Sequence, residues 1–216
     1  MAFPTRRTRT PEAAQPEVWA VVAASAGGAY VEAARRSSDR IVVQRGPWEI
    51  VLDKHVVNNG QYGTTVYTRA STSYLAEDDF TLRMSRRRWY SNLVAPFTIP
   101  DVPIGDDGIE GRYVMRTRNA ARLRSVMNER RVRDLILAQP SMRLEIKGLG
   151  FWDRRKLGNR VRRVSVRTTG VVMEPQRLLD FIDLVEVLAQ QLVRIGSASS
   201  EPVDPSRHNG EVRRRL

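Results

Sequence analysis

The stretch that decides the fold is residues 40–75, whose sequence is RIVVQRGPWEIVLDKHVVNNGQYGTTVYTRASTSYL. Apolar residues such as Ile50 and Leu52 alternate with polar ones, and this repeat of two is typical of a strand with one buried face. Residues 58–60 are Asn-Asn-Gly, in which Asn-Gly is a strong signal for a tight hairpin turn. The second half of the stretch is rich in Thr, Val and Tyr, which favour extended structure. With the alternation that follows, residues 40–88 are predicted to form a four-stranded antiparallel meander.

Upstream of this stretch, a helix is predicted from Pro16 to Arg36. Proline suits the first turn of a helix because its missing N–H is not needed there. Gly27 and Gly28 lie inside the predicted helix, and each glycine costs roughly 1 kcal/mol relative to alanine. Residues 1–15, rich in Thr, Arg, Pro and Ala, are predicted to be a flexible basic arm.

Downstream, the pattern predicts further helices and strands. A helix capped by Asn119 is expected to be split in two by the charged residues 128–131. Pro175 opens a helix with a wide apolar stripe, which ends by Gly196. The remaining strands are expected at 112–117, 142–146 and 164–172, with a long basic hairpin loop at 148–159 between the last two.

These elements define a fold class and a domain plan. Consecutive strands are expected to be joined as hairpins, so the predicted class is α+β, with a largely antiparallel sheet and helices packed on one face. A chain of 216 residues favours one domain, here predicted at 16–198, followed by a disordered basic tail at 199–216.

The charge of the chain is strongly positive. Its 36 basic residues are almost all arginine, and the formal net charge is +12. Such a balance favours nucleic acid, an acidic lipid or an acidic protein as partner. The alternative is an arginine-biased composition with basic tails, because seven arginines lie in the two terminal segments: Arg6, Arg7, Arg9, Arg207, Arg213, Arg214 and Arg215.

Two clusters place arginines beside aromatic residues. Arginines bind phosphates or carboxylates, while aromatic rings stack on nucleic-acid bases. The alternative is that the arginines are solvated strand ends and that the loop tryptophan closes the edge of the core. The candidate residues for contact with an anionic partner are Arg83, Arg86, Arg87, Arg88, Trp89, Tyr90, Trp152, Arg154, Arg155, Lys156, Arg160 and Arg162.

Signals for catalysis or metal binding are weak. The chain has no cysteine, which excludes thiol catalysis, cysteine-ligated zinc and disulfides. No nucleophile motif accompanies His55, and no glycine-rich phosphate loop is present. Acidic residues gather between Asp101 and Glu110, but their spacing is not that of a calcium loop, and they can instead pair with the protein's own arginines. The sequence therefore predicts no enzymatic activity, no metal and no cofactor.

Neither a membrane span nor secretion is predicted. The longest uncharged run, Val18–Val31, has 14 residues, whereas a spanning helix needs about 20. The absence of cysteine fits a reducing compartment. A cytoplasmic location is therefore expected.

One progression of residues resembles a group of uncharacterised small bacterial proteins. These share the pattern W-x-I-x-L-D … T-R … F … D-I-x-I-G-D. The matching positions are Trp48–Asp53, Tyr67–Arg69, Phe80 and Asp101–Asp106, with Leu192–Ala198 similar to the close of their last helix. The likeness covers about residues 40–198 by the order of its motifs. It departs from the pattern at Gly111–Tyr113 and at residues 86–88. The resemblance implies an α+β body and an intracellular location, and it implies no activity.

The leading interpretation is a non-enzymatic binding or adaptor domain, which should expose an apolar patch. The first alternative is a nucleic-acid-binding protein, in which both basic clusters and their aromatic residues should lie on one face. The second alternative is an enzyme, which would need the acidic loop at 101–110 to face His55 across a pocket.

Overall fold

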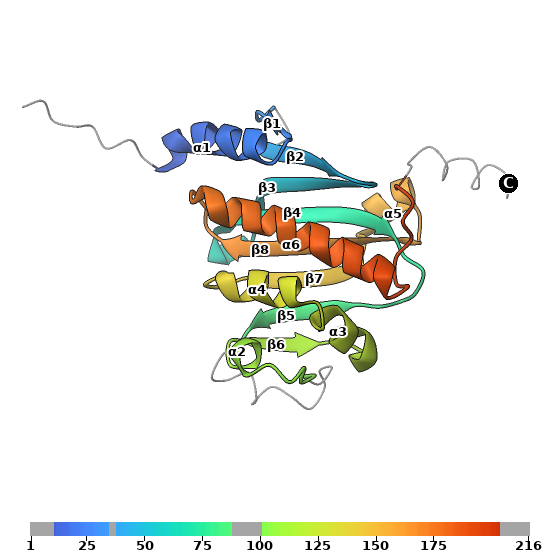
Figure 1. The fold of residues 1–216 in the computed structure, drawn as a ribbon. Helices are drawn as coiled ribbons and strands as arrows, with labels where there is room; N and C mark the ends of the chain where they lie inside the picture. Colours follow the sequence, from blue (N-terminus) through green and yellow to red (C-terminus); the bar gives the residue numbers. More distant parts are fainter. Residues whose placement is uncertain (1–10, 35–37, 88–100, 204–216) are drawn as a thin grey trace, which may run out of the picture.

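The computed structural model describes residues 11–34, 38–87 and 101–203, which form one eight-stranded antiparallel sheet and six α-helices (Figure 1). The strands are β1 (Ala29–Val31), β2 (Arg40–Arg45), β3 (Trp48–Asn58), β4 (Thr64–Leu75), β5 (Leu82–Arg86), β6 (Tyr113–Arg116), β7 (Arg143–Gly148) and β8 (Val161–Thr169). The helices are α1 (Pro11–Ser25), α2 (Asp107–Glu110), α3 (Ala120–Met127), α4 (Arg130–Ala138), α5 (Phe151–Leu157) and α6 (Pro175–Arg194). The predicted α+β class with an antiparallel sheet is confirmed.

The order of the strands differs from the predicted meander. The sheet runs β1-β2-β3-β4-β8-β7-β5-β6, so β8 and β7 separate β5 from β4. The chain leaves β4 and is held by the segment after α6, where the Glu77 N–H donates to the Ser197 carbonyl at 3.0 Å. Ala76 and Ala198 form an isolated bridge beside this bond. The prediction of a four-stranded meander over 40–88 was wrong in its last strand, because alternation identifies a strand but not its neighbour.

The first helix lies earlier than predicted. It runs from Pro11 to Ser25, so residues 11–15 belong to the helix and not to an arm. The helix ends before Gly27, whose φ of 66° is a left-handed conformation that suits glycine. At Gly28, a Cβ would lie 2.4 Å from the Val42 carbonyl oxygen. The glycine pair therefore ends the helix and lets β1 approach β2, and the extension predicted through Arg36 was wrong. Residues 1–10 and 204–216 lie outside the described residues.

The split helix downstream is confirmed. The Asn119 side chain caps α3 by accepting the Arg122 N–H at 3.0 Å. The second half, α4, begins at Arg130 after Glu129, whose side chain accepts the Arg131 N–H at 3.4 Å. Each half therefore has its own cap, which satisfies N–H groups that a helix leaves free at its start.

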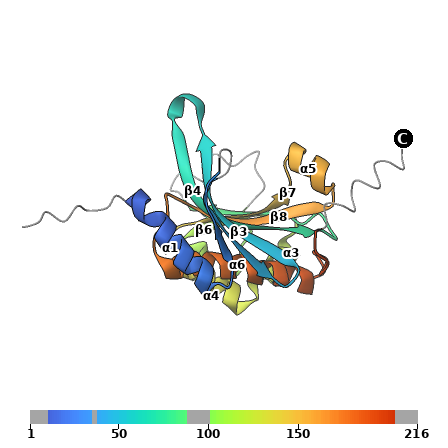
Figure 2. The ribbon, with the colours of Figure 1, turned by 90° about the horizontal axis from the view of Figure 1, so that it is seen from above.

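Helix α6 covers the centre of the sheet. It lies across β3, β4 and β8, and α4 packs beside it (Figure 1). Figure 2 shows α1, α3, α4 and α6 together on one side of the sheet. The buried stripe of α6 includes Leu178, Ile182, Val185, Leu188 and Leu192. Each such side chain contributes roughly 1.5–3 kcal/mol on full burial, so this stripe fixes the helix layer on the sheet. Among the described residues, no helix is both long and apolar enough to cross a bilayer.

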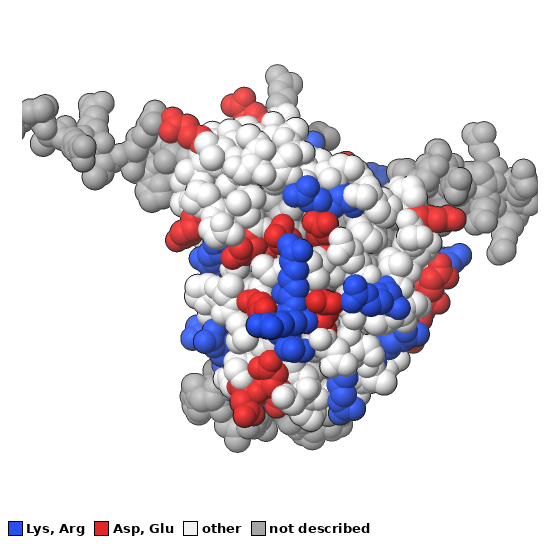
Figure 3. All heavy atoms as spheres, in the orientation of Figure 1, with Lys and Arg blue, Asp and Glu red and all other residues white. Residues whose placement is uncertain are grey.

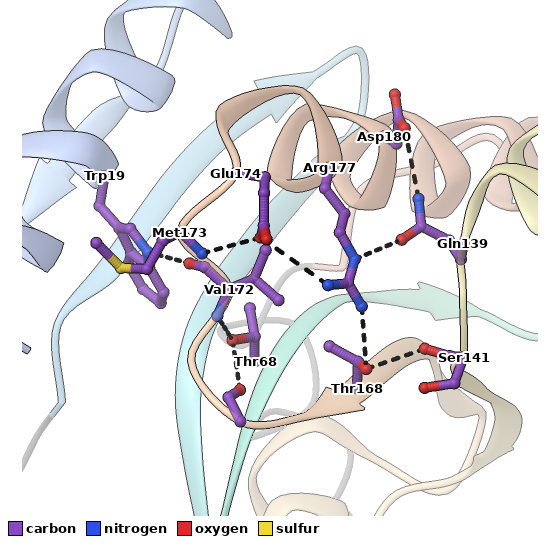
Figure 4. A network of polar contacts seen from close by, with 11 residues as sticks. Trp19, Thr68, Gln139, Ser141, Thr168, Val172, Met173, Glu174, Arg177 and Asp180 are labelled. Carbon is purple, nitrogen blue, oxygen red and sulfur yellow. Dashed lines mark hydrogen bonds and ion pairs between the residues drawn. The ribbon is translucent and has the colours of Figure 1, made fainter. Parts of the chain in front are cut away.

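A polar network joins the helix layer to the sheet (Figure 4). Arg177 of α6 donates to the Gln139 side chain at 3.2 Å and to the Thr168 hydroxyl of β8 at 3.3 Å. The Trp19 indole of α1 donates to the Val172 carbonyl at 3.3 Å. These bonds connect α1, α6 and β8, and they satisfy polar groups that would otherwise be costly to bury.

Candidate functional site

The sheet face opposite α1, α3, α4 and α6 carries a concentration of basic residues, which we call the basic face. Side chains of a strand point alternately to the two faces, and the strand register shows which of them are neighbours. One row of directly opposed residues is Ser71, Ser165, Glu145, Arg83 and Arg116, and the next is Asp53, Arg69, Arg167 and Arg143. Lys147 and Arg163 face each other in a third row. Residues from six strands thus meet on this face.

Glu145 lies at the centre of the basic face and is 7% exposed. Its carboxylate is 2.7 Å from Lys147 Nζ, 3.7 Å from Arg83 Nε, 3.9 Å from Arg167 Nη2 and 4.0 Å from Arg143 Nε. Burial acts to raise the pKa of Glu145. The hydrogen bond and charge of Lys147, with the charges of Arg167 and Arg143, outweigh burial and hold the pKa below its ordinary value. One carboxylate therefore lies within 4.0 Å of four cations and is the shared counter-ion for them.

A line of arginines crosses three neighbouring strands beside Glu145. Arg167 of β8 lies directly between Arg69 of β4 and Arg143 of β7. Like charges that face each other across strands destabilise a sheet. Asp53 compensates one end of the line, with its Oδ1 2.9 Å from Arg69 Nε, and the Arg167 guanidinium lies 4.9 Å from the centre of the Tyr67 ring. The middle of the line keeps an excess of positive charge.

Two arginines of the basic face have unsatisfied donors. The Nε atoms of Arg116 and Arg167 are buried and have no hydrogen-bond partner among the residues that the structure describes. A buried donor without a partner costs about 1–3 kcal/mol. Since both atoms are buried from solvent, they are a cost of packing these arginines in the sheet and not contact points for an anion.

The long loop predicted at 148–159 contains the short helix α5, which lies on the side of the sheet away from α6 (Figure 2). The prediction of a plain loop was wrong there. The ion pair between Asp153 of α5 and Arg163 of β8, at 3.2 Å, attaches the helix to the basic face. Phe151 and Trp152 project from it, with 62% and 73% of their surface exposed, and their ring centres lie 5.4 Å apart. This is an exposed apolar pair of the kind that the adaptor interpretation expects.

The first predicted cluster is only partly a free surface. Arg83 belongs to the basic face, and Arg86 is exposed at the end of β5. Arg87 is engaged within the protein, since its guanidinium bonds the Glu110 carbonyl at 2.8 Å and the Asp101 carboxylate at 2.9 Å. The three remaining predicted residues, Arg88, Trp89 and Tyr90, lie outside the described residues.

The second predicted cluster lies on and beside α5. Lys156 is exposed, and the Arg155 guanidinium lies 5.7 Å from the centre of the Phe151 ring. Arg154 donates to the Leu149 carbonyl at 3.3 Å. Two further arginines have partners in the chain before β5. Arg160, which precedes β8, pairs with Glu77 at 2.8 Å, and Arg162 of β8 donates to the Phe80 carbonyl at 3.4 Å. The cluster thus consists of a basic helix and two neighbouring arginines, Arg160 and Arg162, that are bonded within the protein.

The structure does not bring the described parts of the two clusters together. Leu82 faces Ile146 in the antiparallel pair of β5 and β7, so Arg86 lies beyond the Arg143 end of β7. Helix α5 follows the other end, after Gly148. Six residues of strand separate these positions, which corresponds to roughly 20 Å. The arrangement expected for a nucleic-acid-binding face, with both clusters side by side, is not formed by these residues.

Sequence reasoning missed the residues at the centre of the basic face. Residues 143–147 read Arg-Leu-Glu-Ile-Lys and residues 163–167 read Arg-Val-Ser-Val-Arg, so their polar side chains share one face of each strand. This alternation was visible in the sequence. The pairing of β7 with β8 and of β8 with β4 was not, and only that pairing places Arg69, Arg143 and Arg167 in one line.

The acidic loop is used within the fold. Asp101 pairs with Arg87 at 2.9 Å, and Asp106 pairs with Arg133 at 3.5 Å. Glu110 accepts two backbone N–H groups of its own loop at 2.7 Å, and these bonds lower its pKa. The interpretation that this loop pairs with the protein's own arginines is confirmed. Among the described residues, no group of three histidine, aspartate or glutamate side chains could hold a metal ion.

The arrangement expected by the enzyme interpretation, with the acidic loop at 101–110 facing His55, is not formed. His55 lies on β3, whereas the acidic loop precedes β6, five strands away in the sheet order. At about 4.8 Å per strand the separation is about 24 Å. Burial lowers the pKa of His55, and the charge of Arg69 lowers it further. A histidine with these neighbours fits a structural role in this sheet.

Comparison with known proteins identifies a fold relative. No protein-family model matches the chain, and no curated protein matches it in sequence. A crystal structure of the mycobacterial trehalose monomycolate transport factor A, TtfA, superposes with a TM-score of 0.51 at 10% sequence identity. The match covers 89% of this chain and 98% of that chain. At this identity the likeness concerns the fold alone, and the resemblance to uncharacterised bacterial proteins stays a prediction. The chain thus has a fold similar to that of TtfA.

Proposed function

We propose that this protein is a non-enzymatic adaptor domain that binds an acidic segment of a partner protein on its basic face. The observation that carries the proposal is the group of four cations around Glu145, with distances of 2.7–4.0 Å. One carboxylate does not neutralise four cations, so the group retains a charge of about +3. A partner carboxylate would be attracted to this excess, and an arginine can hold it with two parallel hydrogen bonds.

The two sides of the sheet differ in the balance of their charges, and this difference supports the proposal. Over α6 and α4, positive and negative side chains lie next to one another (Figure 3). Ion pairs there include Arg131 with Asp183 at 3.0 Å and Arg194 with Glu129 at 2.8 Å. On the basic face, in contrast, arginines face arginines. The unbalanced side is the one that gains from an added anion.

The choice of a protein partner rests on the placement of the clusters. Nucleic-acid binding would be favoured by arginines and aromatic residues that lie together along one path. The described parts of the two predicted clusters lie at opposite ends of β5 and β7. TtfA, whose fold is similar, is a transport factor, which also fits an accessory role better than a catalytic one. A cytoplasmic location is part of this proposal.

The test measures binding of the full chain to a fluorescent poly-glutamate peptide by anisotropy across a salt series. The test variant is Arg83→Gln with Lys147→Gln, whose side chains are 58% and 59% exposed in the structure. The control variant removes two exposed arginines of the helix layer, Arg124→Gln with Arg130→Gln. The test variant should bind about tenfold more weakly, because each exposed ion pair contributes up to about 1 kcal/mol.

The result depends on which variant loses affinity. The proposal holds if the test variant loses affinity and the control binds like the natural chain. It is wrong if both variants weaken equally, since binding would then follow net charge and not the basic face. A single-stranded oligonucleotide of equal charge is measured in parallel. If it binds at least tenfold more tightly than the peptide, and through the same residues, the partner is a nucleic acid.

A further inference from the structure

Helix α5 presents exposed aromatic rings and cations together at one end of the sheet. Phe151 and Trp152 are the two most exposed large apolar side chains among the described residues. The last turn of the same helix carries Arg154, Arg155 and Lys156. We propose that α5 docks this protein on the surface of an anionic lipid bilayer. This inference concerns a different surface and a different partner from the proposed function.

The helix is held in place, so the exposed pair is a fixed feature of the fold. Asp153 is paired with Arg163 of β8 at 3.2 Å. Leu149, just before α5, and Val161, the first residue of β8, are 4% and 1% exposed. The buried flanks anchor the helix, while its aromatic residues remain outside. Leu149 and Val161 are buried by the same fold that leaves Phe151 and Trp152 exposed. Neighbouring exposed aromatic side chains are typical of a surface that contacts a partner.

The chemistry of α5 matches the bilayer interface. Tryptophan is enriched at the level of lipid headgroups because its ring is apolar and its indole N–H is polar. Basic side chains near an anionic leaflet are attracted to it, each contributing about fivefold in affinity. In α5 the only acidic residue, Asp153, is already paired with Arg163. The aromatic pair can therefore enter the headgroup layer of an anionic bilayer while the cations of α5 are attracted to its negative charge.

The arrangement of the rings favours lipid over nucleic-acid bases. The Arg155 guanidinium lies over the Phe151 ring at 5.7 Å, and the Trp152 ring meets Phe151 at 79°. A base stacks on a free and accessible ring face, which Arg155 occupies on Phe151. Insertion among lipid headgroups requires exposed apolar area but no free ring face. The geometry thus points to a bilayer surface.

The experiment measures sedimentation of the full chain with vesicles of phosphatidylcholine alone and of phosphatidylcholine with phosphatidylglycerol. The test variants are Phe151→Ser with Trp152→Ser, and Arg154→Gln with Arg155→Gln and Lys156→Gln. Two controls accompany them. Arg213→Gln with Arg214→Gln and Arg215→Gln removes the same number of charges from the C-terminal segment, and Arg83→Gln with Lys147→Gln alters the basic face.

A spectroscopic reading shows whether the tryptophan enters the interface. Trp19 and Trp48 are buried, so in a Trp89→Phe background the emission shift on adding vesicles reports Trp152. Binding to the phosphatidylglycerol vesicles should shift the emission to the blue. The serine variant should lose at least tenfold in partitioning, and the glutamine variant roughly 100-fold in low salt, since three basic residues each contribute about fivefold.

Three results would overturn the inference. The first is equal binding to both kinds of vesicle, or binding to neither. The second is a blue shift that is absent although the protein sediments. The third is loss of binding in the C-terminal or basic-face control while the α5 variants bind normally, which would place the contact elsewhere. Circular dichroism of each variant separates a lost contact from a lost fold. Failure here leaves the peptide-binding proposal standing, because that test uses no vesicles and different residues.

Discussion

Replacing Glu145 by glutamine tests the electrostatic design of the basic face. The substitution keeps the size of the side chain and removes one negative charge from the centre of four cations. In the natural chain these cations lie 2.7–4.0 Å from the carboxylate. In the variant they face a neutral amide, so their mutual repulsion is no longer compensated. We expect a loss of stability and a gain in affinity for anions.

The size of the effect follows from burial. Removing one partner from a fully buried ion pair costs about 3–5 kcal/mol. The Glu145 side chain is 10% exposed, but Arg83 and Lys147 are 58% and 59% exposed, so solvent screens part of the interaction. We therefore expect a loss of about 2 kcal/mol in the free energy of unfolding. For a chain of this size that corresponds to a fall in Tm of about 4–8 °C.

The assay is thermal unfolding at low ionic strength, followed by titration with sodium phosphate. Phosphate should restore more stability to Glu145→Gln than it adds to the natural chain, because an anion that binds only the folded protein stabilises it by mass action. The matched control is Glu77→Gln, which removes a carboxylate from an exposed pair with Arg160, where the side chains are 44% and 65% exposed. That change should cost at most about 1 kcal/mol.

One result would refute this reasoning. If Glu145→Gln unfolds at the same temperature as the natural chain in low salt, the negative charge of Glu145 does not stabilise the four cations around it. Equal stabilisation of both proteins by phosphate would lead to the same conclusion. The excess positive charge of the basic face would then be screened by solvent, and the proposal of an acidic partner would lose its electrostatic basis.

Two further predictions concern the pH dependence of stability and the close backbone contact at Gly28. His55 has a lowered pKa in the fold, so its neutral form is favoured there. This contribution to stability is present above pH 6.5 and is lost as the pH falls through the folded pKa. Urea unfolding at several pH values measures it as a fall in the free energy of unfolding with falling pH. The variant His55→Gln should lack this part of the pH dependence. Gly28→Ala should lower stability by about 1–3 kcal/mol, because the new Cβ would lie 2.4 Å from the Val42 carbonyl oxygen. The exposed Gly150→Ala, whose Cβ meets nothing within 4 Å, is its control, and equal loss in both would contradict the clash.

The sequence predicted what depends on local periodicity. β4 begins at Thr64 and ends at Leu75, as the run of Thr, Val and Tyr indicated, and α6 begins at Pro175. The neighbours of each strand depend on contacts between distant residues, and local alternation carries no such information. For this reason the place of β5 was missed. The seven residues of α5 are too few to show a helical repeat, so they looked like a loop.

Of the four cations around Glu145, only Arg83 was named from the sequence. Arg83 was among the candidate residues, and it lies on the basic face. Arg69 and Arg167 are 98 positions apart in the chain yet directly opposed in the sheet. Their joint effect exists only through that pairing. The group of Phe151, Trp152 and the cations after them was visible in the sequence because these residues are adjacent. The sequence left open whether Trp152 is exposed or closes the edge of the core, and the structure shows it 73% exposed.

The position of β8 has a consequence for the order in which the protein can be built. Among the described residues it is the last strand in sequence, but it lies between β4 and β7 and links the two halves of the sheet. During synthesis β4 and β7 therefore present unpaired edges until residue 169 has left the ribosome. Such edges invite pairing with other chains, and contacts between distant residues slow folding. A nascent chain stopped before β8 would be two incomplete sheets, so the single sheet can form only when this strand has emerged.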